Sequence, residues 1–348
     1  MTQSDFERRA ADLRRRYDAL AAAEPGLRAR NMAARLAVSE AELVAAQCGG
    51  LLAQPLAGEP QALFRELGGL GRVMALTRND WCVHERKGCY LDIHADGPVG
   101  LVLGPDIDLR MFFSCWASAW SVREGPRRSL QFFDASGTAV HKVYALEDGD
   151  LAAFDAFEAR HRGDRRWPQP QAWPADTAAD RVGDPAALRA AWLALTDTHQ
   201  FFPMLRKFKV TRQAALRAAG QDLAQQVEPG ALEAMLQSAA ASGLPLMCFV
   251  ANRGMVQIHT GPVHELRRTG PWYNVLDPDF NLHLDTGAVA SLWVVNKPTD
   301  DGWVTSLEAY AGGGELIVQF FGARKPGKPE LPEWRQLLAG LCAQPLAA

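Results

Sequence analysis

The feature that most constrains the fold of this chain is an internal repeat along most of its 348 residues. "GPDIDLRMFFSCWASAWSV" (104–122) matches "DPDFNLHLDTGAVASLWVV" (277–295) without a gap, at an offset of 173 positions. "SLQFFDASGTAVHKVY" (129–144) matches "SLEAYAGGGELIVQFF" (306–321) at an offset of 177, so only short insertions separate the two copies. A repeat much longer than the roughly 20–50 residues of solenoid units indicates a duplicated domain.

A proline-rich segment separates the two copies. Residues 165–185 carry four prolines and show no apolar periodicity, which is typical of a linker. We therefore predict an N-terminal repeat at 1–164, a Pro-rich linker at 165–184 and a C-terminal repeat at 185–348.

Each copy has the same order of patterns. Helical patterns such as "DFERRAADLRRRYDALAAA" and "DPAALRAAWLALTDT" come first, and Asp184 and Pro185 suit the N-cap and first turn of the second helix. Short apolar or alternating runs such as "IDLRMFF" and "ELIVQFF" follow, with "ASG" and "AGGG" where hairpin turns belong. We predict an α+β fold, a tandem repeat in which each half is an antiparallel β-sheet with flanking helices.

Composition excludes several functional classes. The net charge of −3 gives no support for a nucleic-acid partner. The sequence lacks both an apolar signal core and a run near the roughly 20 apolar residues of a membrane span, so we expect a cytoplasmic protein without membrane insertion. The six cysteines have no CxxC or zinc-ligand spacing, and we expect them to be reduced packing residues.

The duplication provides an internal control, because features present in one half only are candidates for function. His199, in "LTDTHQFFPMLRKFKVTRQ", has no counterpart in the first half. Three acids of the first half face bases in the second, and a fourth site also differs: Glu40 faces Arg212, Glu124 faces Lys297, Glu147 faces Arg324, and Lys142 faces Gln319. The second half has thus gained three cations.

Arg212 stands out further, because Thr211 resembles a helix N-cap and places this arginine in the first helical turn. The helix macrodipole disfavours a cation there. A residue that opposes local preference is a candidate for ligand binding, although a solvated surface arginine is the alternative.

These features together favour a ligand that is anionic at one end, apolar elsewhere, and able to accept a neutral imidazole. Phe201, Phe202 and Met204 follow His199 and could supply an apolar wall, while the cations could pair with carboxylates. Haem has a planar ring, two propionates and an iron that takes an axial histidine, so it meets all three requirements. The alternative is that His199 is a structural residue.

Arg110 is the second asymmetric feature. In "IDLRMFF" the alternation of a strand puts Asp108, Arg110 and Phe112 on one face, and the second half has His283 and Asp285 where the first has Arg110 and Phe112. An arginine beside an aromatic ring suits the face of a porphyrin opposite the histidine. The alternative is an exposed arginine paired with Asp108.

The sequence also resembles a known family. "LTDTHQFFPMLRKFKVTRQAALRAAG", "DIDLRMFFSCWASAW", "WVVNKPT" and "IVQFFGAR" are similar to the bacterial cytoplasmic haem-utilisation proteins, the haemin-degrading factor or haemin-transport family. The resemblance implies the following roles: His199 as the proximal iron ligand, Arg110 as the catalytic distal arginine, Phe112 as an aromatic beside it, and Arg212, Lys297, Gln319 and Arg324 as residues that hold the propionates. Phe321 departs from the pattern, because some relatives have a tyrosine there.

The expected function is a cytoplasmic protein that accepts imported haem and degrades it to release iron, with an external electron donor. The alternative is a non-catalytic chaperone that stores haem or delivers it to a separate oxygenase. A third class is a binding protein for another amphipathic acid. Expected partners are haem and either a haem importer or a separate haem oxygenase. A site that uses both Arg110 and His199 would need both halves of the chain.

Overall fold

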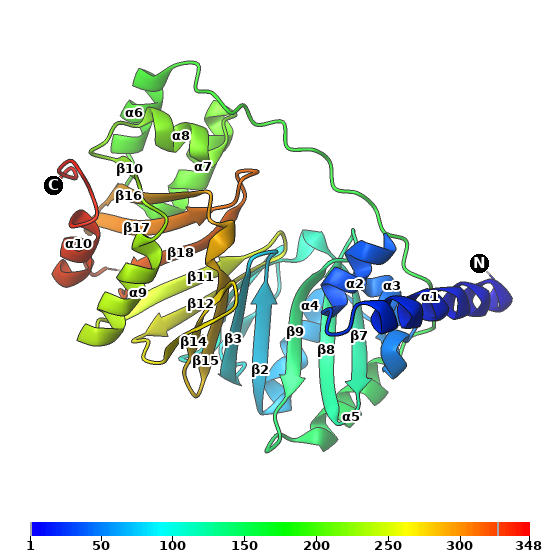
Figure 1. Ribbon diagram of the computed structural model, residues 1–348. Coiled ribbons are helices and arrows are strands. Elements are labelled where there is room, and N and C mark those ends of the chain that lie inside the picture. The colour runs from blue at the N-terminus through cyan, green and yellow to red at the C-terminus, as the bar shows by residue number, and fades with distance from the viewer. Residues whose placement is uncertain (1, 326) are drawn as a thin grey trace. The chain divides into compact units, whose positions relative to one another are not determined.

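A computed structural model describes residues 2–325 and 327–348 of the chain. The chain divides into two compact units, which are described here one at a time (Figure 1). Unit 1 comprises Met1–Arg78, Glu85–Pro174 and Asn252–Gln257, and unit 2 comprises Asn79–His84, Ala175–Ala251 and Ile258–Ala348. Each unit therefore includes one short segment from the opposite half of the sequence.

The main stretch of unit 1 begins and ends with helices, and further short helices interrupt the run of strands between them. The helices are α1 (Gln3–Ala23), α2 (Ala29–Leu36), α3 (Glu40–Ala45), η1 (Cys48–Gly50), α4 (Pro60–Arg65), η2 (Glu66–Leu70), η3 (Phe113–Cys115) and α5 (Leu151–His161). The strands are β1 (Leu52–Leu56), β2 (Arg72–Arg78), β4 (Ile93–His94), β5 (Val99–Leu103), β6 (Asp108–Phe112), β7 (Trp116–Glu124), β8 (Arg127–Asp134) and β9 (Ala139–Ala145), and β3 (Cys82–Cys89) lies partly in each unit.

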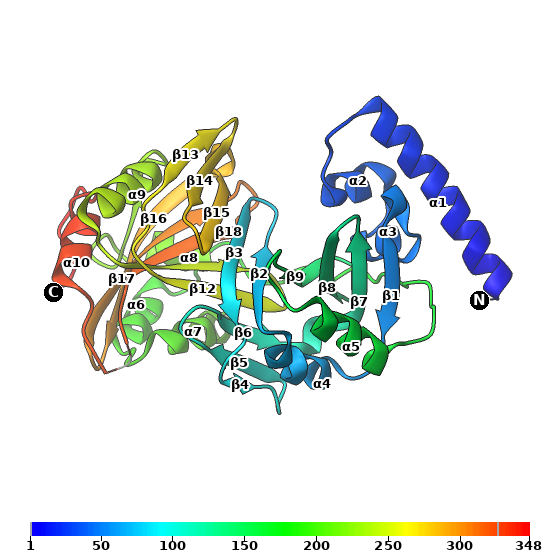
Figure 2. The same cartoon turned by 90° about the horizontal axis from the view of Figure 1, so that it is seen from below.

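The strands of unit 1 form antiparallel ladders in the order β1-β7-β8-β9-β2 and β6-β5-β4. Helix α3 packs on one face of the larger ladder through Trp120 and Phe133, and α4 and α5 pack on the apolar cluster that contains Leu130 and Phe132. The long α1 lies beside α2 and α3 in both ribbon views (Figure 2). The apolar faces of all these helices are thus buried against the sheet or against one another.

Unit 2 repeats the same order of elements. Its helices are α6 (Pro185–Leu193), η4 (Thr198–Gln200), α7 (Phe201–Phe208), α8 (Arg212–Ala218), α9 (Ala231–Ser242), η5 (Thr286–Ala288) and α10 (Pro332–Ala339). Its strands are β10 (Ala224–Val227), β11 (Leu246–Ala251), β13 (Leu266–Thr269), β14 (Trp272–Leu276), β15 (Phe280–Asp285), β16 (Ser291–Thr299), β17 (Gly302–Tyr310) and β18 (Leu316–Gly322), and β12 (Met255–Gly261) lies partly in each unit.

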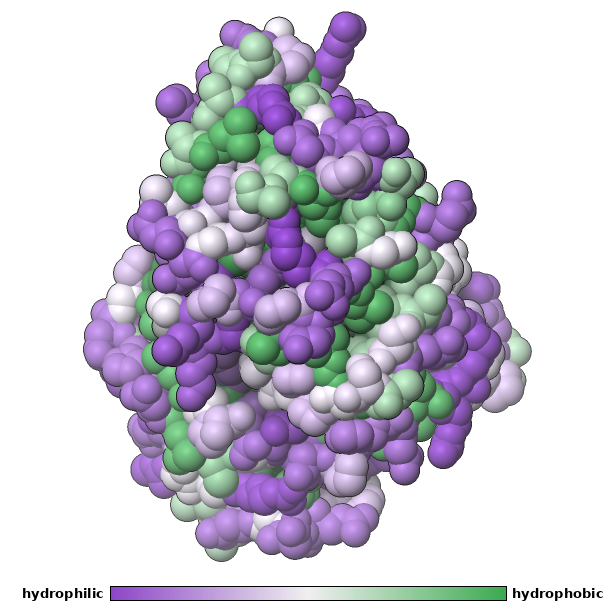
Figure 3. All heavy atoms as spheres, turned by 90° about the vertical axis from the view of Figure 1, so that its left-hand side faces the viewer, coloured by the Kyte–Doolittle hydropathy of each residue, from purple (hydrophilic) through white to green (hydrophobic). Residues whose placement is uncertain are grey.

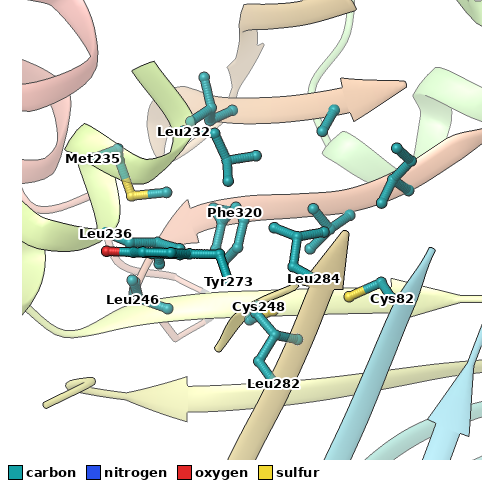
Figure 4. Packing of buried hydrophobic residues seen from close by; sticks show 14 of the residues in the cluster. Cys82, Leu232, Met235, Leu236, Leu246, Cys248, Tyr273, Leu282, Leu284 and Phe320 are labelled. Carbon is teal, nitrogen blue, oxygen red and sulfur yellow. The ribbon is translucent and has the colours of Figure 1, made fainter. Parts of the chain in front are cut away.

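The ladders of unit 2 run β10-β16-β17-β18-β11 and β15-β14-β13, again antiparallel. Helices α6, α7 and α8 pack on the strand face that carries Trp293 and Val295. Helix α9 packs on the opposite face, where Met235 and Leu236 lie over Leu246 and Phe320 (Figure 4). The residues between α6 and α8 therefore lie over one defined face of this sheet.

The two ladders of each unit match element for element, so the predicted α+β tandem repeat with antiparallel sheets and flanking helices is confirmed. The local signals hold too: Asp184 caps α6 through the backbone N–H of Ala187, with Pro185 at the first helical position. Ala37 and Lys209, at matching positions of the repeat, both end a helix with positive φ, 54° and 55°. The repeat therefore extends to backbone detail.

Two further properties bear on the sequence-based expectations. In the described part of the chain, no helix is both long enough and apolar enough to cross a bilayer. All six cysteines are free thiols.

The face seen in Figure 3 mixes hydrophilic and hydrophobic side chains, in keeping with the 22% of charged residues in the sequence.

Candidate functional site

His199 lies in the short 3-10 turn η4, directly before α7, and its side chain is 89% exposed. Its Nδ1 lies 2.6 Å from Oδ1 of Asp197, and the same oxygen accepts the backbone N–H of His199 at 2.7 Å. These hydrogen bonds from His199 hold the pKa of Asp197 below its usual value, so the carboxylate is ionised and accepts the Nδ1 proton. A neutral imidazole in this tautomer keeps the lone pair of Nε2 free for a ligand.

The sequence around His199 explains its position. The ring of Phe201 packs edge-on against Trp192 of α6, with ring centroids 4.5 Å apart. Trp192 in turn donates its indole N–H to the backbone carbonyl of Asn296 on β16. These buried aromatic residues fix the start of α7 on the sheet, so the exposed histidine stands on a rigid support.

The predicted apolar wall is smaller than expected. Phe201 and Met204 are core residues, 2% and 6% exposed, and only Phe202 of the three is open to solvent, at 64%. Phe201 instead contributes its ring face to two cations: the Arg212 guanidinium lies 4.7 Å from the ring centroid and the Lys297 ammonium 4.9 Å. Phe201 thus links the histidine turn to the predicted cationic residues.

Three of the four predicted carboxylate-binding residues converge on one buried acid, Glu308 of β17. Arg212 donates to it from Nε at 2.7 Å and from Nη2 at 2.5 Å. The Lys297 ammonium and the Gln319 amide each donate to Glu308 Oε1 at 3.0 Å. The helix cap is as predicted, with Thr211 accepting from Ala214, but Arg212 has an internal anionic partner that compensates for its place in the first turn.

Charges within this cluster shift each other's pKa values. Burial alone would raise the pKa of Glu308, yet Arg212 and Lys297 hold it well below its usual range. Burial lowers the pKa of Lys297 to about 8, against the opposing effect of Glu308. Burial would also lower the pKa of Arg212, but Glu308 and Tyr310 raise it overall. At neutral pH the three groups are therefore charged, with one net positive charge.

Arg324, the fourth predicted residue, lies at the end of β18. Its Nη2 lies 3.5 Å from Oδ2 of Asp301, while its Nη1 is buried and has no hydrogen-bond partner among the described residues. The charge of Arg324 also contributes to the lowered pKa of Asp197, the partner of His199. A buried guanidinium N–H without an acceptor is costly, which makes Arg324 a good donor for an incoming carboxylate.

Arg110 and Phe112 lie on β6 in unit 1, whereas the other predicted site residues lie in unit 2. The predicted alternation is confirmed, because Leu109 and Met111 are fully buried and Arg110 and Phe112 are half-buried. Arg110 forms an ion pair with Asp108, the alternative considered from sequence, and its side chain is 31% exposed. The distal role of Arg110 stays a prediction.

The counterparts of these residues in the first half form contacts of their own. Glu40, the counterpart of Arg212, is 6% exposed and forms an ion pair with Arg78. Lys142, the counterpart of Gln319, contributes to the lowered pKa of Glu40. Both units thus carry an ion pair at the first residue of the corresponding helix, which is an acid in unit 1 and a base in unit 2.

Three residues of the site escaped the sequence analysis. Glu308 and Tyr310 face Gln131 and Phe133 in the repeat alignment, so the same comparison of halves contained the signal. Asp197 precedes His199 by two positions and was readable as the acceptor of a short Asx turn. No group of three or more His, Cys, Asp or Glu side chains in the described residues is arranged to hold a metal ion.

The fold and site together define a class: a duplicated α+β protein whose second half carries an exposed, carboxylate-bonded histidine and a cluster of cations around the buried Glu308. Comparison with known proteins identifies the family. The model of the haemin-degrading HemS/ChuX domain matches residues 37–161 and 209–341, so the chain belongs to that family.

Relatives span nearly the whole chain. The hemin transport protein HmuS of Yersinia pestis is 41% identical over 345 residues, which is 97% of this chain and 99% of that protein. The structure of apo-PhuS, a heme-binding protein of Pseudomonas aeruginosa, is 48% identical, covers 96% of this chain and 100% of its own, and has a TM-score of 0.92. ChuS, a heme degrading enzyme of Escherichia coli O157:H7, is 36% identical over 96% of this chain and 99% of its own, with a TM-score of 0.90.

Proposed function

We propose that this protein binds haem in the cytoplasm, with the iron on His199, and degrades it to release iron. The observation that carries the proposal is the hydrogen bond between His199 Nδ1 and Asp197, which leaves Nε2 free on an exposed, rigidly supported imidazole. The described relatives that bind or degrade haem support the same ligand.

The residues of unit 2 suit the two ends of a haem molecule. Asp197 orients the imidazole, as partner carboxylates of metal-bound histidines do. Arg324, with its unpartnered Nη1, and the cluster of Arg212, Lys297 and Gln319 supply donors for the two propionates. Phe202, three residues after His199, offers an exposed ring for contact with the macrocycle. Bound haem supplies an iron centre at which oxygen or peroxide reacts.

In this proposal Arg110, with Phe112 two positions further along β6, would donate hydrogen bonds during the chemistry that bound haem supplies. A guanidinium is always charged and donates in a fixed geometry, so it suits the stabilisation of a polar iron ligand. Electrons come from an external donor, because the sequence carries no flavin or nicotinamide fingerprint.

The second candidate is a non-catalytic chaperone that accepts haem from an importer and passes it to a separate oxygenase. It is favoured by the relatives described as hemin transport or heme-binding proteins, while degradation is favoured by the family description and by ChuS. The exposed His199 fits either function, because an accessible ligand allows both uptake and transfer of haem.

A two-stage absorbance experiment tests both candidates. Haem is first titrated into the protein, and a Soret band of a histidine-bound complex is expected at one equivalent. A reductant such as ascorbate, or dilute peroxide, is then added to the complex. Loss of the Soret band with release of iron, blocked in Arg110→Ala, supports degradation. A stable Soret band with every donor supports the chaperone.

A further inference from the structure

Glu308 is the most heavily hydrogen-bonded carboxylate of the site. Besides Arg212, Lys297 and Gln319, it accepts from the Ser306 hydroxyl at 2.9 Å and from the Tyr310 hydroxyl at 2.5 Å. Its side chain is completely buried on β17, between β16 and β18. Glu308 therefore occupies the position that a bound carboxylate would otherwise take among these donors.

This carboxylate cannot leave when a ligand arrives. Its backbone lies in the middle of a paired strand, and Ser306 and Tyr310, on the same strand, hold both of its oxygens. Removing this buried charge would also leave the buried Lys297 and the partly exposed Arg212 without their counter-charge, which is strongly unfavourable. An incoming carboxylate must therefore join the cluster and use donors that Glu308 leaves free.

Such donors remain on the cations. Arg212 gives Nε and Nη2 to Glu308, while its Nη1 forms no hydrogen bond among the described residues and the side chain is 22% exposed. Lys297 gives two of its three N–H groups to Glu308 and Ser306, and its side chain is 3% exposed. Arg212 therefore has its Nη1 available for a ligand at a partly exposed edge. The buried Lys297 of the same cluster has one N–H that it does not donate to Glu308 or Ser306.

We propose that Glu308 is the resident counter-ion of this cluster, a positioning residue that holds the Lys297 ammonium and the Arg212 guanidinium in place so that one carboxylate of the ligand can bind. The proposal rests on the proposed function for the identity of that ligand, a haem propionate. Because Glu308 cancels one of the two positive charges, the cluster matches a single carboxylate, and Arg324 is left for the second.

Within the described part of the chain, the groups that face Lys297 are Arg212 from α8, Phe201 from α7, Glu308 and Ser306 from β17, and Phe321 from β18. Burial and the Arg212 charge both disfavour the ammonium, and the Glu308 carboxylate is the charged group that opposes them. Without this carboxylate, the pKa of Lys297 would be lower. Its charged contact to a propionate would then be lost at a lower pH than in the wild type.

Glu308→Gln tests the idea, since glutamine has nearly the same shape and is the residue that the first half carries at Gln131. The first measurement is the NMR titration of the Lys297 amine in protein without haem. We expect a midpoint near pH 8 in the wild type and a midpoint lower by about 1–3 units in the variant. The second is haem affinity against pH: the wild type should weaken as pH rises through 8, the variant at a correspondingly lower pH, and Lys297→Met should show no such step.

Equal midpoints for the Lys297 amine in the wild type and Glu308→Gln would overturn the proposal, as would tighter haem binding by the variant with an unchanged pH profile. If Glu308→Gln does not fold, Glu308→Asp keeps the charge but shortens the side chain, so the contact between carboxylate and ammonium lengthens and the same midpoint should move downward by a smaller amount. No movement in that variant contradicts the proposal. Absence of haem binding by the wild type would instead contradict the proposed function, and the amine titration would still decide the role of Glu308.

Discussion

Asn79 and Asn252 occupy equivalent positions of the repeat and make equivalent hydrogen bonds in the two units. In unit 2 the Asn79 amide donates to the carbonyls of Ala251 and Ile317, at 3.2 and 2.8 Å. In unit 1 the Asn252 amide donates to those of Arg78 and Val140, at 3.0 and 2.8 Å. Each unit is thus completed by an asparagine turn from the opposite half of the sequence.

Replacing either asparagine with alanine should destabilise the protein by about 2–4 kcal/mol, because two backbone carbonyls lose their donor and the turn loses its acceptor. Chemical denaturation measures the loss. Asn→Asp at the same positions keeps the turn acceptor and removes the two donors, so most of the loss should persist. The exposed Asn31 on α2 is the matched control, with less than about 0.5 kcal/mol expected for Asn31→Ala. Losses as small as this at Asn79 and Asn252 would show that the shared turns do not stabilise the units.

Arg324→Gln should weaken haem binding by about 10- to 100-fold, because a charge-assisted contact to a partly buried carboxylate is worth roughly 1.5–3 kcal/mol. Affinity for a porphyrin with esterified propionates should change little. Arg217→Gln, which breaks an exposed ion pair with Asp180 in the same unit, is the control. Equal losses for acid and ester would assign Arg324 to folding rather than to the ligand.

Lys297→Glu should mainly lower the stability of the protein. It would place a second carboxylate beside the fully buried Glu308, and we expect a loss of about 3–5 kcal/mol in the free energy of unfolding. Lys297→Met removes the charge without adding an acid and should cost less. Equal stability of Lys297→Glu and the wild type would contradict the observed burial of this pair.

Arg110→Ala should leave stability within about 1 kcal/mol of the wild type, because its ion pair with Asp108 is partly exposed. Haem affinity should also be largely retained, since His199 and the carboxylate contacts remain. The rate of ring opening and the sixth-coordination spectrum should change. Asp108→Asn, which breaks the same ion pair but keeps the arginine, separates the two effects. If Arg110→Ala matches the wild type in both spectrum and degradation, Arg110 is a surface residue.

Asp197→Asn should lower the affinity of His199 for iron by about 10-fold or more, because a neutral amide oxygen accepts the Nδ1 proton more weakly than a carboxylate does. The asparagine oxygen can still accept the backbone N–H of His199, so η4 should persist. Asp176→Asn, which changes an aspartate that likewise accepts a backbone N–H two residues later, is the control. An unchanged haem spectrum and affinity in Asp197→Asn would remove this carboxylate from the site.

Much of the fold was predictable because the two halves of the sequence are similar over long segments. Alternation placed Arg110 and Phe112 on the open face of β6, and the Asp184 and Thr211 caps marked helix starts correctly. Such signals are local and depend on side-chain periodicity. The exchange of short segments between the units was not predictable, because Asn79 and Asn252 look like ordinary turn residues in sequence.

The site was predictable in its members and less so in its contacts. Comparison of the halves selected Arg212, Lys297 and Gln319, yet it could not show that all three donate to Glu308. A buried acid is hard to recognise from sequence, since only its tertiary surroundings distinguish it from an exposed one. The same limit applies to Phe201, whose aromatic ring looked like part of a ligand wall and is instead a core residue.

The most direct test of the account is a haem titration of His199→Ala beside the wild type, followed by Soret absorbance, with circular dichroism as the control for folding. The side chain is 89% exposed, so the variant should fold like the wild type. We predict a one-equivalent, histidine-type Soret band for the wild type, and a shifted or lost band with weaker binding for His199→Ala. An identical Soret band and affinity in the folded variant would contradict the assignment of His199 as the iron ligand.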